Sequence, residues 1–284
     1  MDLRDDIQII CEVLQIRESD LAKKLGVSLE TINNWKFYRK RISLANLERL
    51  YSFAYDSGIE LNSIYEQLMK EEYQKDDTVV LFHGAKKPFS MPIDFLANSK
   101  PTNDFGTGFY LGETFEQAAN YISVLDRSFV YCFKLNLKDL KTHRFNVDTE
   151  WMLTIAYFRG WLDDYRDSSI VRSIVKKVSD CDIVIAPIAD NRMFDLIAQF
   201  VEGEITDEQC RHSLAATDLG PQYVIKSERS LKNIELLQEL YVCEKEKQRY
   251  LLDREKLTTS GAQKIRAARV RYRNKGRYIE EILK

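Results

Sequence analysis

The chain has 284 residues, 44% of them hydrophobic and 30% charged, and its formal net charge at pH 7 is −2. This length is enough for one large or two modest domains, and the composition is typical of a soluble globular protein. No apolar run is long enough to span a membrane, and no signal peptide is expected at the N-terminus, so the sequence predicts a cytoplasmic protein.

The cysteines are five in number and scattered along the chain, without any C-x-x-C spacing. They are Cys11, Cys132, Cys181, Cys210 and Cys243. This pattern indicates buried or free thiols in a reducing compartment and argues against a zinc site. We therefore expect no bound metal.

The first quarter of the chain predicts a bundle of short helices. One helix is expected from Glu18 to Leu25, a turn follows at Gly26, and Ser28 is placed to cap a further helix ending at Phe37. A serine at this position stabilises a helix because its hydroxyl accepts a hydrogen bond from an otherwise unpaired amide. The wording from Asp20 to Trp35 resembles helix-turn-helix proteins of the phage-repressor type.

This resemblance implies a DNA-binding domain over residues 1–70. The N-terminal residues of the second helix would then face base edges, while basic residues at its end would contact phosphates. The implied DNA-binding residues are Ser28, Leu29, Glu30, Thr31, Asn34, Lys36 and Arg39. An ordinary helical domain, or one that binds another protein, stays open as the alternative.

The composition changes after a charged connector at residues 70–77. Residues 78–234 alternate apolar, β-branched strands with helical segments and predict a central mixed α/β domain. Residues 235–284 are predicted to be helical and increasingly basic. The expected fold class is therefore α+β, and the basic tail either is a solvated helix face or binds phosphates or an acidic surface.

Three segments of the central domain carry glycines or polar groups at strands. They are His83-Gly84, the stretch from Asp104 to Leu111, and the strand Pro221–Ile225. In this order they resemble the nucleotide-pocket strands of the ADP-ribosyltransferase superfamily, especially its poly(ADP-ribose)-polymerase-like, diphtheria-toxin-like branch. They also resemble an uncharacterised bacterial family placed in that superfamily. Taken singly, each motif is equally typical of a strand that packs in a core.

The resemblance implies NAD as substrate and a catalytic set of His83, Tyr110 and Gln222. The implied NAD-binding residues are His83, Gly84, Thr107, Gly108, Tyr110 and Tyr121. In particular, Tyr110 is expected to stack on the nicotinamide ring. Gln222 stands where this superfamily usually has a glutamate, so it can hydrogen-bond a ribose hydroxyl but brings no negative charge. Glu228, Glu150 and Asp190 are candidates to supply that charge.

The leading hypothesis is a mono-ADP-ribosyltransferase that acts as a bacterial toxin or defence effector and carries a DNA-binding module. The alternative is a DNA-binding regulator whose degenerate central domain senses NAD or ADP-ribose without catalysis. An NAD glycohydrolase, with water as acceptor, would use the same pocket. The expected partners are NAD, DNA and an acceptor macromolecule, with no membrane contact, and a homodimer stays open.

Overall fold

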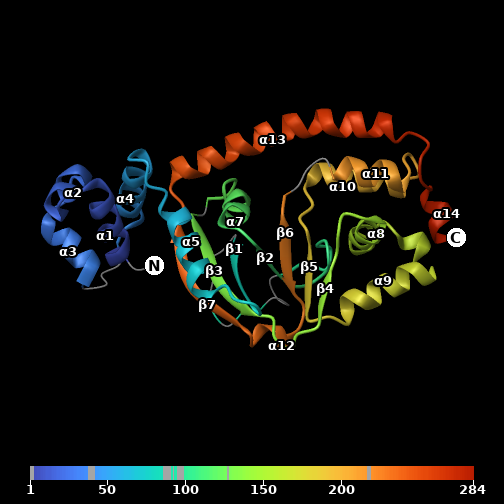
Figure 1. Cartoon of the computed structure of the whole chain (residues 1–284), viewed down its shortest axis with the longest axis horizontal. Coiled ribbons are helices and arrows are strands. Elements are labelled where there is room, and N and C mark those ends of the chain that lie inside the picture. The colour runs from blue at the N-terminus through green and yellow to red at the C-terminus, as the bar shows by residue number, and fades with distance from the viewer. Residues whose placement is uncertain are drawn as a thin grey trace.

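The computed structural model of the chain describes residues 3–37, 42–85, 91, 93–94, 99–126, 128–215 and 219–284, and the side chains of 257–260 lie outside the description. A group of N-terminal helices packs beside one seven-stranded sheet, whose other half is covered by further helices. One long helix runs along the top of the molecule in Figure 1 from the N-terminal helices to the opposite end. The predicted mixture of helices and strands is confirmed.

The N-terminal helices have the bounds that their local capping signals indicate. They are α1 (Leu3–Leu14), α2 (Glu18–Leu25), α3 (Leu29–Phe37), α4 (Leu44–Asp56) and α5 (Leu61–Tyr73). Gly26 ends α2 in the left-handed region, with φ 67°, which glycine adopts without steric cost. The Ser28 hydroxyl accepts from the Thr31 amide at 3.1 Å, so its predicted capping role is confirmed.

The sheet has seven strands in the order β4-β5-β6-β2-β1-β3-β7. Their bounds are β1 (Thr78–Gly84), β2 (Phe109–Gly112), β3 (Phe129–Asn136), β4 (Thr142–Arg144), β5 (Ile183–Pro187), β6 (Pro221–Ile225) and β7 (Ile234–Tyr241). Only β4 and β5 run parallel, and all other neighbours are antiparallel.

β7 corrects the predicted start of the helical tail at residue 235. The run Ile234–Tyr241 is rich in Leu, Glu and Gln, which favour helices in isolation. In the folded protein it pairs with β3 along almost its whole length and becomes an edge strand of the sheet. Tertiary pairing therefore outweighs local propensity here, and the central domain extends to Tyr241.

The helices outside the N-terminal group lie mainly against the sheet. They are α7 (Phe115–Ile122), α8 (Thr149–Phe158), α9 (Ser169–Ser179), α10 (Asn191–Val201), α11 (Asp207–Leu214), α12 (Glu228–Leu231), α13 (Glu244–Arg271) and α14 (Ile279–Leu283), with a 3-10 turn at Asp163–Tyr165. The core formed with α8, α10 and α11 includes Val184 and Val224 of the sheet. A third, smaller core around Leu81, Phe133 and Tyr223 lies on the opposite face.

The N-terminal helices share one hydrophobic core with β1, β3 and β7, so they are not a loosely tethered module. The buried Asn62 of α5 donates to the Tyr241 carbonyl and to the Glu246 carboxylate, both at 2.8 Å. The Tyr241 hydroxyl in turn donates to Glu48 of α4 at 2.7 Å. These contacts join α4 and α5 to the end of the sheet and the start of α13.

Candidate functional site

The three segments singled out in the sequence lie side by side, because β6, β2 and β1 are consecutive strands of the sheet. Gly112 is paired with Gln222 on one side and with Phe82 on the other. Residues far apart in the chain therefore meet at one end of three neighbouring strands. This is the arrangement that a shared ligand site would need.

His83 lies where β1 and β2 part. Phe82 and Gly112 are the one pair in the described register of these strands. Beyond it, the His83 Nδ1 lies 2.8 Å from the Tyr110 carbonyl oxygen and donates to it. The ring packs on Phe109, with centroids 4.5 Å apart. Burial lowers the pKa of His83 to about 4, so the imidazole is neutral at pH 7 with Nδ1 protonated.

The predicted catalytic residues do not all project from one face. Tyr110 is paired with Val224, and Gly112 with Gln222, so the side chains of Tyr110 and Gln222 share a face of the sheet. His83 alternates with Phe82 and lies on the opposite face. A ligand that reaches both sides must pass the point where β1 and β2 separate.

Tyr110 holds its own loop. Its hydroxyl donates to the Gly106 carbonyl at 2.6 Å and accepts from the Phe105 amide at 3.2 Å. The ring packs against the core under α8 and α10, and burial raises the pKa of Tyr110. The structure therefore gives Tyr110 a positioning role, and its ring is not placed as an open surface for stacking.

Lys226 fixes the loop that contains Thr107 and Gly108. Its ammonium group donates to the carbonyls of Phe105 and Thr107, and burial lowers the pKa of Lys226 to about 8. A Cβ atom on Gly108 would approach the Val224 Cγ1 to 2.6 Å. Close packing of the protein itself therefore requires this glycine. Nothing in the sequence singled out Lys226.

Gln222 lies beside a carboxylate that the sequence reasoning did not assign. Its side chain is buried, its amide nitrogen donates to the Pro187 carbonyl at 3.3 Å, and it hydrogen-bonds Asp104. Asp104 also pairs with Arg159 at 2.7 Å. Burial raises the pKa of Asp104, although the bonds from Arg159 and Gln222 oppose that shift. The available signal was the position of Asp104 directly before the Phe105-Gly106 motif.

The three carboxylates considered from the sequence are engaged elsewhere. Glu228 is exposed and begins α12, beyond the opposite end of β6. Glu150 pairs with Lys177 at 2.6 Å near the outer strand β4. Asp190 lies at the same sheet end as Gln222, but it caps α10 and pairs with Arg192 at 2.7 Å.

Gly84 and Tyr121 are brought together by α7. A Cβ atom on Gly84 would lie 2.7 Å from the Ala118 carbonyl oxygen and 3.2 Å from the Tyr121 Cδ1. Tyr121 is 47% exposed, and α7 is held at its start by the Thr114 capping box. An accessible aromatic ring thus lies directly beside the end of β1, where the sequence predicted a nicotinamide contact.

The predicted DNA-binding residues lie on α3 and just before it. Ser28, Leu29 and Glu30 are exposed, whereas Thr31 and Asn34 are half-buried. The ammonium group of Lys36 pairs with Glu18 of α2, and the Lys36 side chain is only 13% exposed. Lys36 therefore ties two helices together. Arg39 lies outside the described residues.

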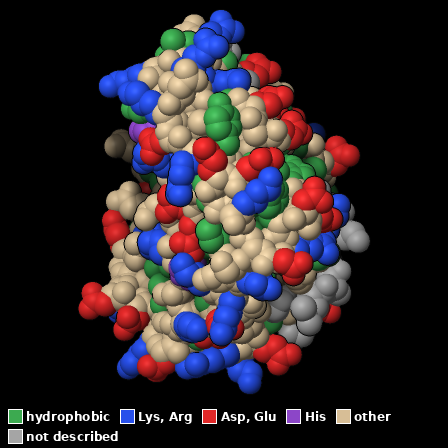
Figure 2. Space-filling model, turned by 90° about the vertical axis from the view of Figure 1, so that its right-hand side faces the viewer, with side chains coloured by type: hydrophobic (Ala, Val, Ile, Leu, Met, Phe, Trp, Pro, Cys, Tyr) green, Lys and Arg blue, Asp and Glu red, His purple; other side chains and the backbone are tan. Residues whose placement is uncertain are grey.

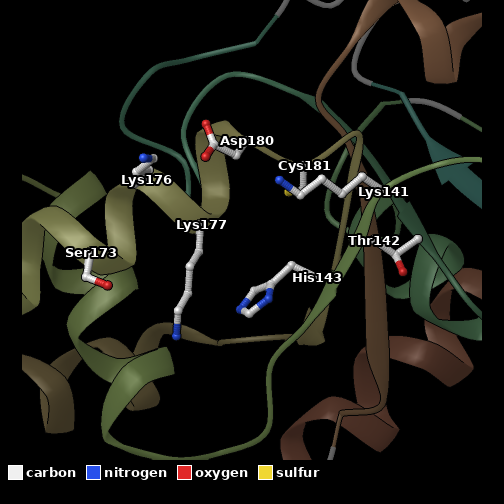
Figure 3. A pocket seen from close by; sticks show the side chains of 8 residues that line it. All are labelled: Lys141, Thr142, His143, Ser173, Lys176, Lys177, Asp180 and Cys181. Atoms are coloured by element: carbon white, nitrogen blue, oxygen red, sulfur yellow. The ribbon is translucent and has the colours of Figure 1, made fainter.

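A separate cavity of about 300 Å³ opens between β4 and α9. Its described lining consists of Lys141, Thr142, His143, Ser173, Lys176, Lys177, Asp180 and Cys181. Lys177 and His143 reach into the same space from the two elements (Figure 3). None of the residues predicted to bind NAD is among these lining residues, so this cavity is distinct from the β1-β2-β6 site.

A family model with the description "Protein of unknown function (DUF3990)" matches residues 79–236, more than half of the chain. The chain belongs to the DUF3990 family. The DUF3990 span starts in β1 and ends in β7, so it contains the whole β1-β2-β6 site and excludes α1–α5 and α13. No curated protein matches the chain, and no solved structure matches it.

Two further findings concern only the part of the chain that the structure describes. No group of three or more His, Cys, Asp or Glu residues is arranged to hold a metal ion there. No helix within the described ranges, including the polar 28-residue α13, is long and apolar enough to cross a membrane.

Proposed function

We propose that the DUF3990 region of this protein binds NAD at the β1-β2-β6 site and transfers its ADP-ribosyl group to an acceptor macromolecule. The observation that carries the proposal is the meeting of His83-Gly84, the loop before Tyr110, and Gln222 on three adjacent strands. The Asp104 carboxylate beside Gln222 adds the negative charge that the glutamine itself lacks.

The chemistry requires charge stabilisation on the ribose. As the bond between the ribose C1 and the nicotinamide nitrogen breaks, the bonding electrons leave with nicotinamide and the ribose acquires oxocarbenium character. The acceptor nucleophile then bonds to C1 and loses a proton. Gln222 can hydrogen-bond a ribose hydroxyl, while Asp104 lowers the energy of the developing cation. Such a contribution is typically about 3 kcal/mol.

Other residues of the site fit the recognition of NAD. The neutral His83 ring can accept a hydrogen bond from a ribose hydroxyl, because Nδ1 already carries its proton. The Gly84 backbone can bond the nicotinamide amide. Tyr121, rather than Tyr110, suits stacking on the flat ring because it is the more accessible of the two.

The direct test is nicotinamide release from NAD by the full chain, together with transfer of label from NAD to protein or nucleic acid. Asp104→Asn keeps the side-chain shape and removes the charge, so we expect release to fall about 100-fold. Glu228→Gln, a carboxylate beyond the other end of β6, should leave release unchanged. A wild-type protein that neither binds nor cleaves NAD contradicts the proposal.

A second candidate function is binding of NAD or ADP-ribose without turnover. It is favoured by the ion pair of Asp104 with Arg159, which neutralises the carboxylate nearest Gln222. In that case calorimetry shows NAD binding while no nicotinamide appears. An NAD glycohydrolase would instead release both nicotinamide and free ADP-ribose, because water replaces the acceptor.

We further propose that α3 and the preceding Ser28 contact DNA, as the resemblance of residues 20–35 implies. The exposure of Ser28, Leu29 and Glu30 supports this role. A toxin or defence effector directed or controlled by such a DNA contact is the biological setting we favour.

A further inference from the structure

The segment from Lys264 to Arg277 concentrates positive charge. No Asp or Glu occurs between Glu255 and Glu280. The segment contains five arginines and two lysines, namely Lys264, Arg266, Arg269, Arg271, Arg273, Lys275 and Arg277. All are exposed except Arg269, which is half-buried. We name this segment the basic platform.

The basic platform is not one continuous helix face. α13 ends at Arg271, and Asn274 and Gly276 have φ values of 62° and 85°. These left-handed residues turn the chain back, so that Arg273, Lys275 and Arg277 lie on a turn that follows the helix. The cations are thereby gathered in a compact cluster and not strung out along an extended helix.

Main-chain contacts with α11 hold the platform in place. Gln209 donates to the Arg269 carbonyl at 3.0 Å, and the Thr206 hydroxyl donates to the Lys275 carbonyl. A third contact is mutual, because the Arg277 amide donates to the Asp207 carboxylate at 2.7 Å. The platform is docked through its backbone, so its charged side chains are not needed for docking.

A ring stack adds to this docking. Tyr272 lies on His212 of α11 with ring centroids 3.6 Å apart and planes inclined by 8°. A Cβ atom on Gly276 would come within 2.3 Å of the Asp207 carboxylate, so the turn fits closely against α11. The cations are consequently presented on an ordered backbone, which lowers the entropy lost when they bind a ligand.

The acidic residues of α11 do not neutralise these cations. The Asp207 carboxylate is occupied by main-chain amides, and Glu208 pairs with Arg211 at 2.8 Å and with His212 at 3.2 Å. Charge alone would also be compatible with an ordinary helix end, where cations offset the helix dipole. That explanation does not extend to Arg273, Lys275 and Arg277, which lie beyond the helix.

We propose that the basic platform binds the phosphate backbone of nucleic acid without sequence preference. Duplex DNA carries about one negative charge per 1.7 Å of its axis, a density that a compact group of seven cations matches. The predominance of arginine fits phosphate, which the guanidinium group binds through two parallel hydrogen bonds. An acidic protein is the less suited partner, because its carboxylates are usually interspersed with other groups.

The platform is distinct from the proposed DNA contact of α3. The two lie at opposite ends of the long axis of the molecule in Figure 1. Figure 2 looks at the platform end, where Lys and Arg side chains gather along the upper margin. One protein molecule therefore carries two separated surfaces for nucleic acid, of which this one contributes affinity and no sequence selection.

The test is fluorescence anisotropy of the full chain with a labelled 25-base-pair duplex of arbitrary sequence, across a series of salt concentrations. The variant R266Q/R273Q/R277Q removes three charges and keeps every main-chain contact. We expect at least about tenfold weaker binding, and a slope of log K against log salt that is shallower by about 3. The control K75Q/K138Q/K232Q removes the same charge at exposed lysines elsewhere and should change neither quantity.

Thermal denaturation establishes that each variant is folded, and K264Q/R271Q/K275Q provides a second set if the first is destabilised. Binding that is unchanged in both sets overturns the proposal, and so does equal weakening in the lysine control. Labelled polyglutamate is the remaining comparison. If it binds the platform more tightly than the duplex does, the partner is an acidic protein and the proposal is wrong.

Discussion

At the scale of single residues, the side chain of Gln222 meets the Asp104 carboxylate, and this contact changes what a substitution at position 222 should do. A glutamate at 222 would place two carboxylates together, and like charges at that distance raise the pKa of one of them. The charge that the superfamily usually carries at this position is thus supplied here from the neighbouring loop.

This contact predicts the outcome of exchanging the charge between the two positions. We expect Gln222→Ala to reduce nicotinamide release, and Gln222→Glu alone to give no gain at pH 7. The double variant D104N/Q222E should recover most of the release that D104N loses, because one negative charge again faces the ribose. Nicotinamide release by the four proteins measures this, and an unaffected Gln222→Ala variant would remove Gln222 from the site.

His83 gives a prediction for stability against pH. Its pKa is about 4 in the folded protein, below its ordinary value of 6.5, so the unfolded chain binds a proton that the folded protein does not. Stability is therefore present above pH 6.5 and is lost as the pH falls toward 4, by about 3 kcal/mol.

The measurement compares wild type with His83→Gln by urea unfolding between pH 7 and pH 4. Wild type should lose about 3 kcal/mol more than the variant over this range. Asp6 and Glu246, whose pKa values burial raises to about 6 and about 7, act in the opposite sense in both proteins. Parallel curves for the two proteins would show that His83 is not titrating in this way.

At the scale of elements, α2 and α3 are joined by the ion pair of Glu18 with Lys36, and this assigns different roles to neighbouring residues of α3. Lys36 was expected to contact phosphate, but its pairing predicts a structural effect instead. Asn34 is half-buried on α3, and it stays a candidate for base contact.

We therefore expect Asn34→Ala to relax sequence preference in DNA binding, with little change in the salt dependence. Lys36→Ala should lower the Tm while leaving the slope of log K against log salt unchanged, since an ion-paired lysine releases no counterion on binding. Anisotropy at several salt concentrations and thermal denaturation distinguish these outcomes. A shallower slope for Lys36→Ala would restore Lys36 as a phosphate contact.

At the scale of the whole molecule, the N-terminal helices and the DUF3990 sheet form one body because they share a core and the Asn62 bonds. A fragment that contained only the N-terminal helices would expose apolar surface that β1, β3 and β7 now cover. DNA binding is for this reason best measured on the full chain.

Asn62→Ala should destabilise the protein by about 2–3 kcal/mol, because it leaves the buried Glu246 carboxylate and the Tyr241 carbonyl without this donor. Asn191→Ala, at an exposed position on α10, serves as the matched control and should cost less than about 0.5 kcal/mol. Urea unfolding measures both. Equal small effects would mean that the interface tolerates loss of these bonds.

The sequence by itself determined the features that depend on neighbours along the chain. The bounds of α2 and α3 follow from Gly26 and Ser28, because capping bonds join residues only three or four positions apart. The strands β1, β3 and β6 were predictable in the same way, since their apolar and β-branched runs are local signals.

Only the tertiary structure decided the features that depend on residues far apart. Ile234–Tyr241 became a strand because β3 offered it a partner. Asp104 came to lie beside Gln222, and Lys36 beside Glu18, because the fold closed those distances. Burial then set the charge of His83 and the role of Tyr110, and burial is a property of the packed molecule that no local pattern contains.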